Sequence, residues 1–265
     1  MEILLRERSD AGVLTLTMNR PERKNALDRA LADELVRALE EAEASASVRA
    51  VVLAGAGDAF CSGGDLGSQP EQTERSEQGE QRHSLSILRR IARPAEALYR
   101  FSKPTLARVD GVAAGAGWNL ALGCDLVVAS DRARFAQIFA RRGLTLDMGG
   151  SWLLPRLVGL HRAKQIALLA EWLSAEQAFA LGLVNRVVPA AELDAAVDEW
   201  AQRLAAGPPV ALALTKRLLG ESFGRSFGEA IEAENAAQAV NLGTQDTREA
   251  FRAFFEKREP RFEGR

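Results

Sequence analysis

The stretch "DGVAAGAGWNLALGCDL", residues 110–126, decides how this chain folds. Eight of its 17 residues are glycine or alanine, and no charge lies between its two terminal aspartates. Glycine is costly inside a helix or a strand, yet the apolar segments on either side predict that this stretch is buried. A buried segment with so little side chain lets another group approach its backbone closely.

A second glycine-rich turn, "GAGDAFCSGGDL" at residues 55–66, also follows a predicted strand. Turns that lead into helices expose backbone N–H groups that have no acceptor within the helix. Two such groups that converge on one point form an oxyanion hole, which stabilises negative charge on a carbonyl oxygen. Close packing of a helix on a sheet explains the same small residues, and residue type alone leaves both interpretations open.

The segments on either side of these turns predict an α/β fold with parallel pairing of strands. Leu27, Leu31, Leu35 and Leu39 recur every four residues, which predicts an amphipathic helix within 27–45. Strands are expected within 12–21, 49–55, 103–111 and 124–130. Residues 68–82 are polar and indicate a surface loop or lid. We therefore expect a core domain over 1–190 and a helical region over 191–265, and we recognise no internal repeat.

Composition limits the possible partners of the chain. It has 265 residues, of which 47% are hydrophobic and 26% charged, and its net charge is −2. This balance gives no reason to expect binding to nucleic acid or to a membrane surface. Cys61 and Cys124 both lie in small apolar surroundings, so we expect no disulfide. Because no signal peptide or membrane-spanning helix is evident, we expect a cytoplasmic protein.

Several common catalytic motifs are missing from the sequence. There is no Walker phosphate loop and no "GxSxG" motif, and Leu120 replaces the third glycine of a dinucleotide-binding turn. His83 and His161 are isolated, so no metal site is expected. An isolated acid, Asp147 in "GLTLDMGG", is a further candidate for chemistry.

Taken together, "AFCSGGDL" (59–66) and "KPTLARVDGVAAGAGWNLALGCDLVVAS" (103–130) resemble the crotonase, or enoyl-CoA hydratase/isomerase, family. The resemblance extends from "LTLTMNRPERKNALD" (14–28) to the closing "AFFEKREPRFEGR" (253–265). It implies a spiral of ββα units with a helical C-terminal trimerisation region, assembled as a homotrimer or as a hexamer of two trimers. It also implies an acyl-CoA thioester substrate and no tightly bound cofactor, since coenzyme A is part of the substrate.

The resemblance also implies roles for individual residues. By motif position, the oxyanion amides fall on Gly64 and Ala116. Backbone groups around Ser62, Gly64 and Leu66 would contact the adenine of coenzyme A. Lys257 would contact its phosphates, although a solvated cation at the end of a helix explains this lysine equally well.

The chain departs from true hydratases of this family, which carry two glutamates. Those positions hold Asn119 and Phe139 here, and neither side chain acts as a base at neutral pH. Asp147 matches instead an aspartate that moves protons in the ring-1,2-epoxyphenylacetyl-CoA isomerase and dienoyl-CoA isomerase branches. On residue type alone, an aspartate before two glycines is more typical of a helix cap.

The leading hypothesis is an acyl-CoA double-bond isomerase in which Asp147 is the acid and base. A 2-enoyl-CoA hydratase is the first alternative. An acyl-CoA dehalogenase is another, because His83 and Trp118 match residue types used in that branch. A non-catalytic acyl-CoA-binding scaffold is the alternative from a different class of protein. The sequence does not indicate the length of the acyl chain or whether it carries a ring.

Overall fold

Two β-sheets form the centre of the molecule in the computed structural model, which describes residues 2–65, 67 and 84–265. The larger sheet has the order β1-β2-β3-β5-β7-β10, in which β1 and β2 are antiparallel and the other neighbours are parallel. Its strands are β1 (Leu4–Arg8), β2 (Val13–Met18), β3 (Ala50–Gly55), β5 (Thr105–Val109), β7 (Leu126–Ser130) and β10 (Arg186–Val188).

The smaller sheet has the order β4-β6-β8-β9, and its first three strands are parallel. Its strands are β4 (Ala59–Cys61), β6 (Val112–Ala114), β8 (Arg134–Ala136) and β9 (Leu173–Ser174). Successive strands alternate between the sheets: β3, β5 and β7 each belong to the larger sheet, and the strand that follows each belongs to the smaller one. Helical segments follow each pair, so the chain forms a spiral of ββα units.

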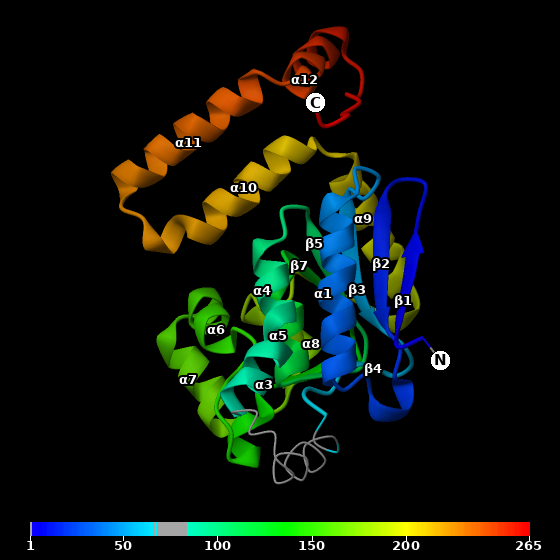
Figure 1. Cartoon of the computed structure of the whole chain (residues 1–265), viewed down its shortest axis with the longest axis vertical. Coiled ribbons are helices and arrows are strands. Elements are labelled where there is room, and N and C mark those ends of the chain that lie inside the picture. Colours follow the sequence, from blue (N-terminus) through cyan, green and yellow to red (C-terminus); the bar gives the residue numbers. More distant parts are fainter. Residues whose placement is uncertain (1, 66, 68–83) are drawn as a thin grey trace.

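Helices cover both faces of the larger sheet (Figure 1). The α-helices are α1 (Arg29–Ala44), α3 (Ser84–Ile91), α4 (Arg93–Arg100), α5 (Ala116–Gly123), α6 (Gly150–Val158), α7 (Leu160–Leu169), α8 (Ala175–Ala180), α9 (Leu193–Ala206), α10 (Pro209–Glu221), α11 (Phe227–Leu242) and α12 (Gln245–Glu256). Short 3-10 helices are η1 (Pro21–Arg23), η3 (Ile138–Arg142), η4 (Ala190–Glu192) and η5 (Ser222–Gly224). Val51 and Leu53 of β3 pack in the core that includes α1 and α5, whereas Val52 packs in the core that includes α9.

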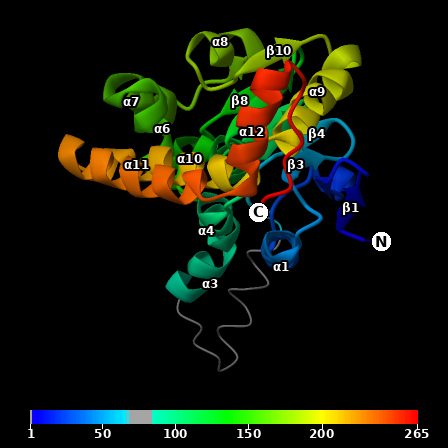
Figure 2. The ribbon, with the colours of Figure 1, turned by 90° about the horizontal axis from the view of Figure 1, so that it is seen from above.

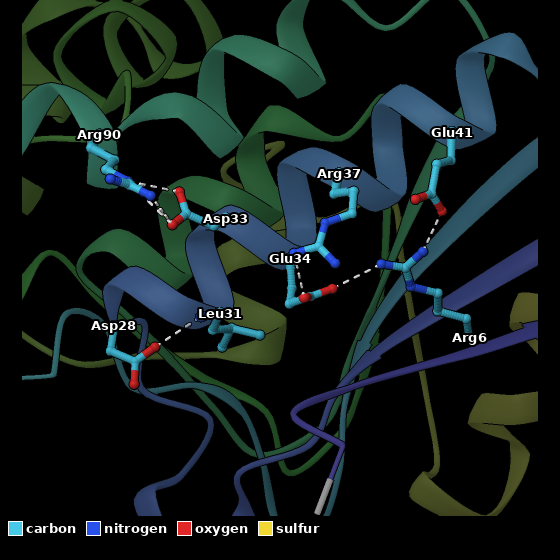
Figure 3. A network of polar contacts seen from close by, with 8 residues as sticks. All are labelled: Arg6, Asp28, Leu31, Asp33, Glu34, Arg37, Glu41 and Arg90. Carbon is cyan, nitrogen blue, oxygen red and sulfur yellow. Dashed lines mark hydrogen bonds and ion pairs between the residues drawn. The ribbon is translucent and has the colours of Figure 1, made fainter.

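The predicted helix within 27–45 is confirmed as α1, and its start is set by a cap. Asp28 accepts a hydrogen bond from the backbone N–H of Leu31 at 2.8 Å, so the helix begins at Arg29. Its leucine face is buried. Its outer face carries ion pairs, including one between Asp33 and Arg90, which ties α3 to α1 (Figure 3).

The C-terminal helices α10, α11 and α12 extend away from the two sheets (Figures 1 and 2). In contrast, α9 packs on the larger sheet although it lies within the helical region expected over 191–265. A salt bridge of 2.8 Å between Lys216 and Asp125 joins α10 to the core. Within the described residues, no helix is long and apolar enough to cross a membrane. The loop expected at 68–82 lies outside the described residues.

Candidate active site

The three parallel strands of the smaller sheet end at one edge, and each is followed by a candidate segment. Cys61 of β4 is opposite Ala113 of β6, and Ala114 of β6 is opposite Ala136 of β8. The turns after β4, β6 and β8 therefore lie beside one another. In sheets of this kind, ligands bind outside the carboxyl ends of the strands.

The turn after β4 leaves one backbone amide available. Leu27 N–H donates to Gly63 O at 2.7 Å, and Asp65 N–H donates to Leu27 O at 2.9 Å. The amide between them, that of Gly64, has no acceptor among the described residues. Gly64 is exposed, and no atom of the described residues lies within 4 Å of the position that a Cβ would occupy there. The backbone of Gly64 is therefore accessible from solvent, and its N–H is unpaired among the described residues.

The turn after β6 leaves a second amide available. Gly115 precedes α5 with φ +52° and ψ −123°, a conformation that glycine adopts without strain. Ala116 begins the helix, so its N–H has no acceptor within α5, and no other acceptor occurs in the described part of the chain. A Cβ on Gly63 would lie 3.8 Å from the nitrogen of Ala116. The structure thus places the two glycine-rich turns against each other.

The small residues of α5 also serve close packing. A Cβ on Gly117 would lie 2.3 Å from the carbonyl oxygen of Cys61, so the helix contacts β4 directly at this glycine. Both interpretations of the glycine-rich stretch therefore apply, at different residues. Gly117 permits packing, whereas Gly115 and Ala116 form the turn.

Asn119 and Phe139, the positions at which the resemblance implies glutamates in hydratases, hold groups that are buried in the protein. Asn119 is fully buried, donates from Nδ2 to the carbonyl oxygen of Asp147 at 2.9 Å, and accepts at Oδ1 from Gln137 Nε2 at 2.8 Å. Phe139 is 7% exposed, and its ring lies 3.5 Å from the Cβ position of Gly115. Neither residue offers a base to a bound molecule.

Asp147 carries the carboxylate of this region. Its side chain makes no hydrogen bond or ion pair with any described residue, and it is exposed to solvent. Desolvation by the surrounding protein nevertheless raises the pKa of the Asp147 carboxyl to about 6. The interpretation of Asp147 as a helix cap is wrong, because Gly149 is the residue that precedes α6 and no side chain in the described part of the chain caps that helix.

Helix α5 contacts both the segment that leads to Gly64 and the segment that carries Asp147, so Gly64, Ala116 and Asp147 lie on segments that meet at this helix. Ser62 lies in the same turn, but its N–H donates to Lys24 O at 3.0 Å. Leu66 lies outside the described residues. Lys257 is exposed at the end of α12, and Figure 1 shows that helix at the opposite end of the molecule from β4.

Of the two residues connected with the dehalogenase alternative, Trp118 lies within the described residues and His83 does not. Trp118 is fully buried and packs on Phe135, with ring centroids 5.4 Å apart. Its indole N–H has no partner in the described part of the chain. His83 lies outside the described residues. Over residues 2–65, 67 and 84–265, no group of three or more potential ligands could hold a metal ion.

Sequence reasoning did not identify Gln137 as part of this region. This glutamine is fully buried and directly follows β8, at the same sheet edge as the other turns. A polar side chain immediately after an apolar strand was the available signal. Its role became visible only from the hydrogen bond to Asn119.

The fold is shared with proteins named as enoyl-CoA hydratases and isomerases. A putative enoyl-CoA hydratase/isomerase from Mycobacterium abscessus superposes with a TM-score of 0.92 at 36% identity, covering 99% of this chain and 100% of that one. A probable enoyl-CoA hydratase of Rhodobacter capsulatus is 40% identical over 255 residues, covering 96% of this chain and 95% of the relative. The 1,2-epoxyphenylacetyl-CoA isomerase of Escherichia coli is 36% identical over 273 residues, covering both chains completely.

The sequence pattern of the enoyl-CoA hydratase/isomerase family matches residues 8–265. The chain belongs to this family of crotonase-fold enzymes. The resemblance seen in the two glycine-rich turns is thereby confirmed, as is the expected α/β fold. The names of the relatives include both hydratases and isomerases at similar identity, so they do not choose between the two reactions.

Proposed function

We propose that this enzyme is an acyl-CoA double-bond isomerase with one catalytic carboxylate. Asp147 is the acid and base, and the backbone amides of Gly64 and Ala116 hold the thioester oxygen. The proposal rests mainly on which of the three candidate catalytic positions carries a carboxylate side chain. Of positions 119, 139 and 147, only the last has a carboxylate, and that carboxylate is unpartnered among the described residues, with its pKa raised to about 6.

The reaction conserves every atom of the substrate. Asp147 removes a proton from C2 of a 3-enoyl-CoA, and the electron pair moves to the thioester oxygen to form a dienolate. The two amides stabilise the negative charge on that oxygen. The protonated carboxyl then delivers the proton to C4, and the double bond shifts from C3 to C2. A carboxyl with a pKa of about 6 is mostly ionised at pH 7 and still donates a proton readily.

Hydration is less well supported by the same geometry. Adding water to a 2-enoyl-CoA requires a group that holds and deprotonates that water. The amide of Asn119 is buried and bonded to Asp147 and Gln137, and the ring of Phe139 has no proton acceptor. An enzyme with Asp147 as its sole acid and base can isomerise, whereas the usual hydratase mechanism needs a second group.

The remaining contacts to the substrate belong to the proposal as well. We propose that Ser62, Gly64 and Leu66 form the edge that receives the adenine, and that Lys257 contacts the phosphates of coenzyme A. We also propose a homotrimer or a hexamer of two trimers. The family resemblance supports these assignments.

The test is a panel of acyl-CoA substrates turned over by the wild-type enzyme and by Asp147→Asn. We expect conversion of 3-enoyl-CoA to 2-enoyl-CoA, and a fall in kcat of at least about 100-fold in the variant with KM little changed. Asp198→Asn on α9, which replaces an exposed aspartate far along the chain, is the matched control and should keep wild-type kcat.

Four results of this panel would overturn the proposal. Water addition to 2-enoyl-CoA without isomerisation would assign a hydratase, and release of halide would assign a dehalogenase. Binding without turnover of any substrate would assign a scaffold. Near wild-type isomerisation by Asp147→Asn would remove Asp147 from the mechanism.

A further inference from the structure

We propose that Asn119, held in place by Gln137, is a positioning residue that fixes Asp147 relative to the amide of Ala116. This inference rests on the proposed function, since it assigns a role toward the same proton-transferring carboxylate. Asn119 lies in the first turn of α5, three residues after Ala116. One turn of helix therefore links the proposed oxyanion donor to the segment that carries the acid.

The hydrogen bonds of this group allow only one orientation. The carbonyl oxygen of Asp147 can only accept, so Asn119 must present its NH₂ group to it. The oxygen of Asn119 then faces Gln137, which must present its own NH₂ group. Both side chains are fully buried, so water cannot replace either bond at low cost. These two hydrogen bonds, from Gln137 to Asn119 and from Asn119 to Asp147, form a relay that holds the backbone of Asp147 rather than its carboxylate.

The turn after Asp147 needs such support. Met148 has φ +49° and Gly149 has φ +79°, so two successive residues are left-handed. A non-glycine residue persists in this conformation where surrounding contacts hold it. Met148 is 2% exposed, and the Asp147 carbonyl accepts hydrogen bonds from both Asn119 and Gly150. Asn119 thus supplies a side-chain hydrogen bond to the backbone of this strained turn.

The first residue of α6 packs directly against Asn119. A Cβ on Gly150 would lie 2.4 Å from Nδ2 of Asn119, so the first residue of α6 is in direct contact with this amide. A larger residue at position 150 would push α6 away from α5. The glycine therefore allows Asn119 to reach the carbonyl of Asp147. Asn119, Gln137 and Gly150 together couple two segments that carry the proposed chemistry.

A double-mutant cycle between Asn119 and Asp147 tests the inference. In the intact enzyme, Asn119→Ala should lower kcat by about 10- to 100-fold with KM within about twofold, because misplacement of a catalytic group by about 1 Å costs this much. In the Asp147→Asn background, the same change should lower kcat by less than about twofold, because Asn119 acts through Asp147. Leu120→Val alters a buried neighbour on α5 that faces the core beside Leu35, and it should leave kcat unchanged.

The pH profile gives a second readout that a merely structural role would not change. No ion pair contributes to the raised pKa of Asp147, which comes from desolvation alone. Loosening the turn would move the carboxylate away from the surrounding protein and reduce its desolvation, so the acid limb of kcat/KM should move below pH 6 in Asn119→Ala. If Asn119→Ala does not fold, Gln137→Leu tests the same relay. It should lower kcat by about five- to tenfold at unchanged KM.

The outcomes separate this inference from the proposed function. Wild-type kcat in both Asn119→Ala and Gln137→Leu would overturn the positioning role. Losses that multiply in the double variant would also overturn it, because Asn119 would then act independently of Asp147. Full activity of Asp147→Asn would instead overturn the proposed function itself.

Discussion

At the residue scale, the chemistry of this enzyme depends on what surrounds one carboxyl group. Asp147 is accessible to solvent, yet no donor or cation among the described residues contacts its carboxylate. Desolvation then has nothing to offset it, and the pKa rises to about 6. Asp110 shows the opposite case, because hydrogen bonds from Arg132 lower the pKa of that carboxyl despite its burial.

The raised pKa of Asp147 predicts how activity depends on pH. The base must be ionised, so kcat/KM should fall about tenfold per pH unit once the pH drops below about 6. A carboxyl with an ordinary pKa would instead hold its activity to about pH 4. Steady-state rates between pH 4.5 and 8 measure this limb. If the residual kcat/KM of Asp147→Asn also falls below about pH 6, the group that titrates there is not Asp147.

The same shift has a consequence for stability. The folded pKa of Asp147 lies above its usual value of 3.8, so the folded state binds a proton more tightly than the unfolded state. The free energy of unfolding therefore decreases as the pH rises from about 4 to about 6, and the loss is complete above that range. Removing this charge in Asp147→Asn should raise Tm at pH 8 and change Tm little at pH 4, where the wild-type carboxyl is already protonated, and thermal melts at the two pH values measure the difference.

At the element scale, the start of α5 decides whether a substrate oxygen can be held. Ala116 occupies the first helical position, where the missing N–H of a proline disrupts no helical bond. The preceding Gly115 has no side chain that would clash with the proline ring. Ala116→Pro therefore removes the proposed oxyanion donor with little other change in the helix.

We expect Ala116→Pro to lower kcat by about 10²- to 10³-fold, or about 2.7–4 kcal/mol of transition-state stabilisation. Steady-state kinetics with 3-enoyl-CoA measure this loss, and the circular dichroism spectrum must match that of the wild type. Ala116→Ser keeps the N–H and provides the matched control. A folded proline variant with activity within threefold of wild type would show that this amide does not hold the oxygen.

Local patterns predicted most of the larger elements but not the shortest strands. The leucine spacing predicted α1, and Asp28 explains why it begins at Arg29. In contrast, no strand was expected at Arg186–Val188, yet these residues form β10 by pairing with β7. Three residues carry too little periodicity to indicate a strand. Their conformation follows from the neighbouring strand rather than from their own propensity.

At the scale of the whole molecule, the C-terminal helices leave large apolar side chains in solvent. Phe227 on α11 is 84% exposed, and Phe254 and Phe255 on α12 are 76% and 80% exposed. Large apolar side chains left exposed on projecting helices are typical of an interface with another chain. This surface belongs to the region in which the sequence predicts contacts between copies.

We expect a trimer or a hexamer in solution, with α10–α12 at the contacts between chains. Light scattering at micromolar concentration measures the mass. Phe255→Glu should shift the mass toward the monomer, because it would bury an unpaired charge in the interface. Ala11→Glu adds the same charge in the exposed turn between β1 and β2 and should leave the mass unchanged. A stable wild-type monomer would contradict the expected assembly.

The sequence by itself determined which chemical groups are available and where local structure begins and ends. The two glycine-rich turns, the leucine face of α1, and the residues at positions 119, 139 and 147 are all readable from the chain. Glycine and capping residues act on their immediate neighbours, and a leucine face repeats over a few turns. These local patterns can therefore be interpreted without any knowledge of the rest of the fold.

Only the tertiary structure decided which of these groups meet. No repeat was recognised in the sequence, yet the strands alternate between two sheets so that β4, β6 and β8 end at one edge. Likewise, Asn119 holds the carbonyl of Asp147 across 28 residues, and Gln137 orients that amide. The periodicity of a segment shows which face is buried but not which segment covers it, because that depends on pairing and packing between residues far apart in the chain.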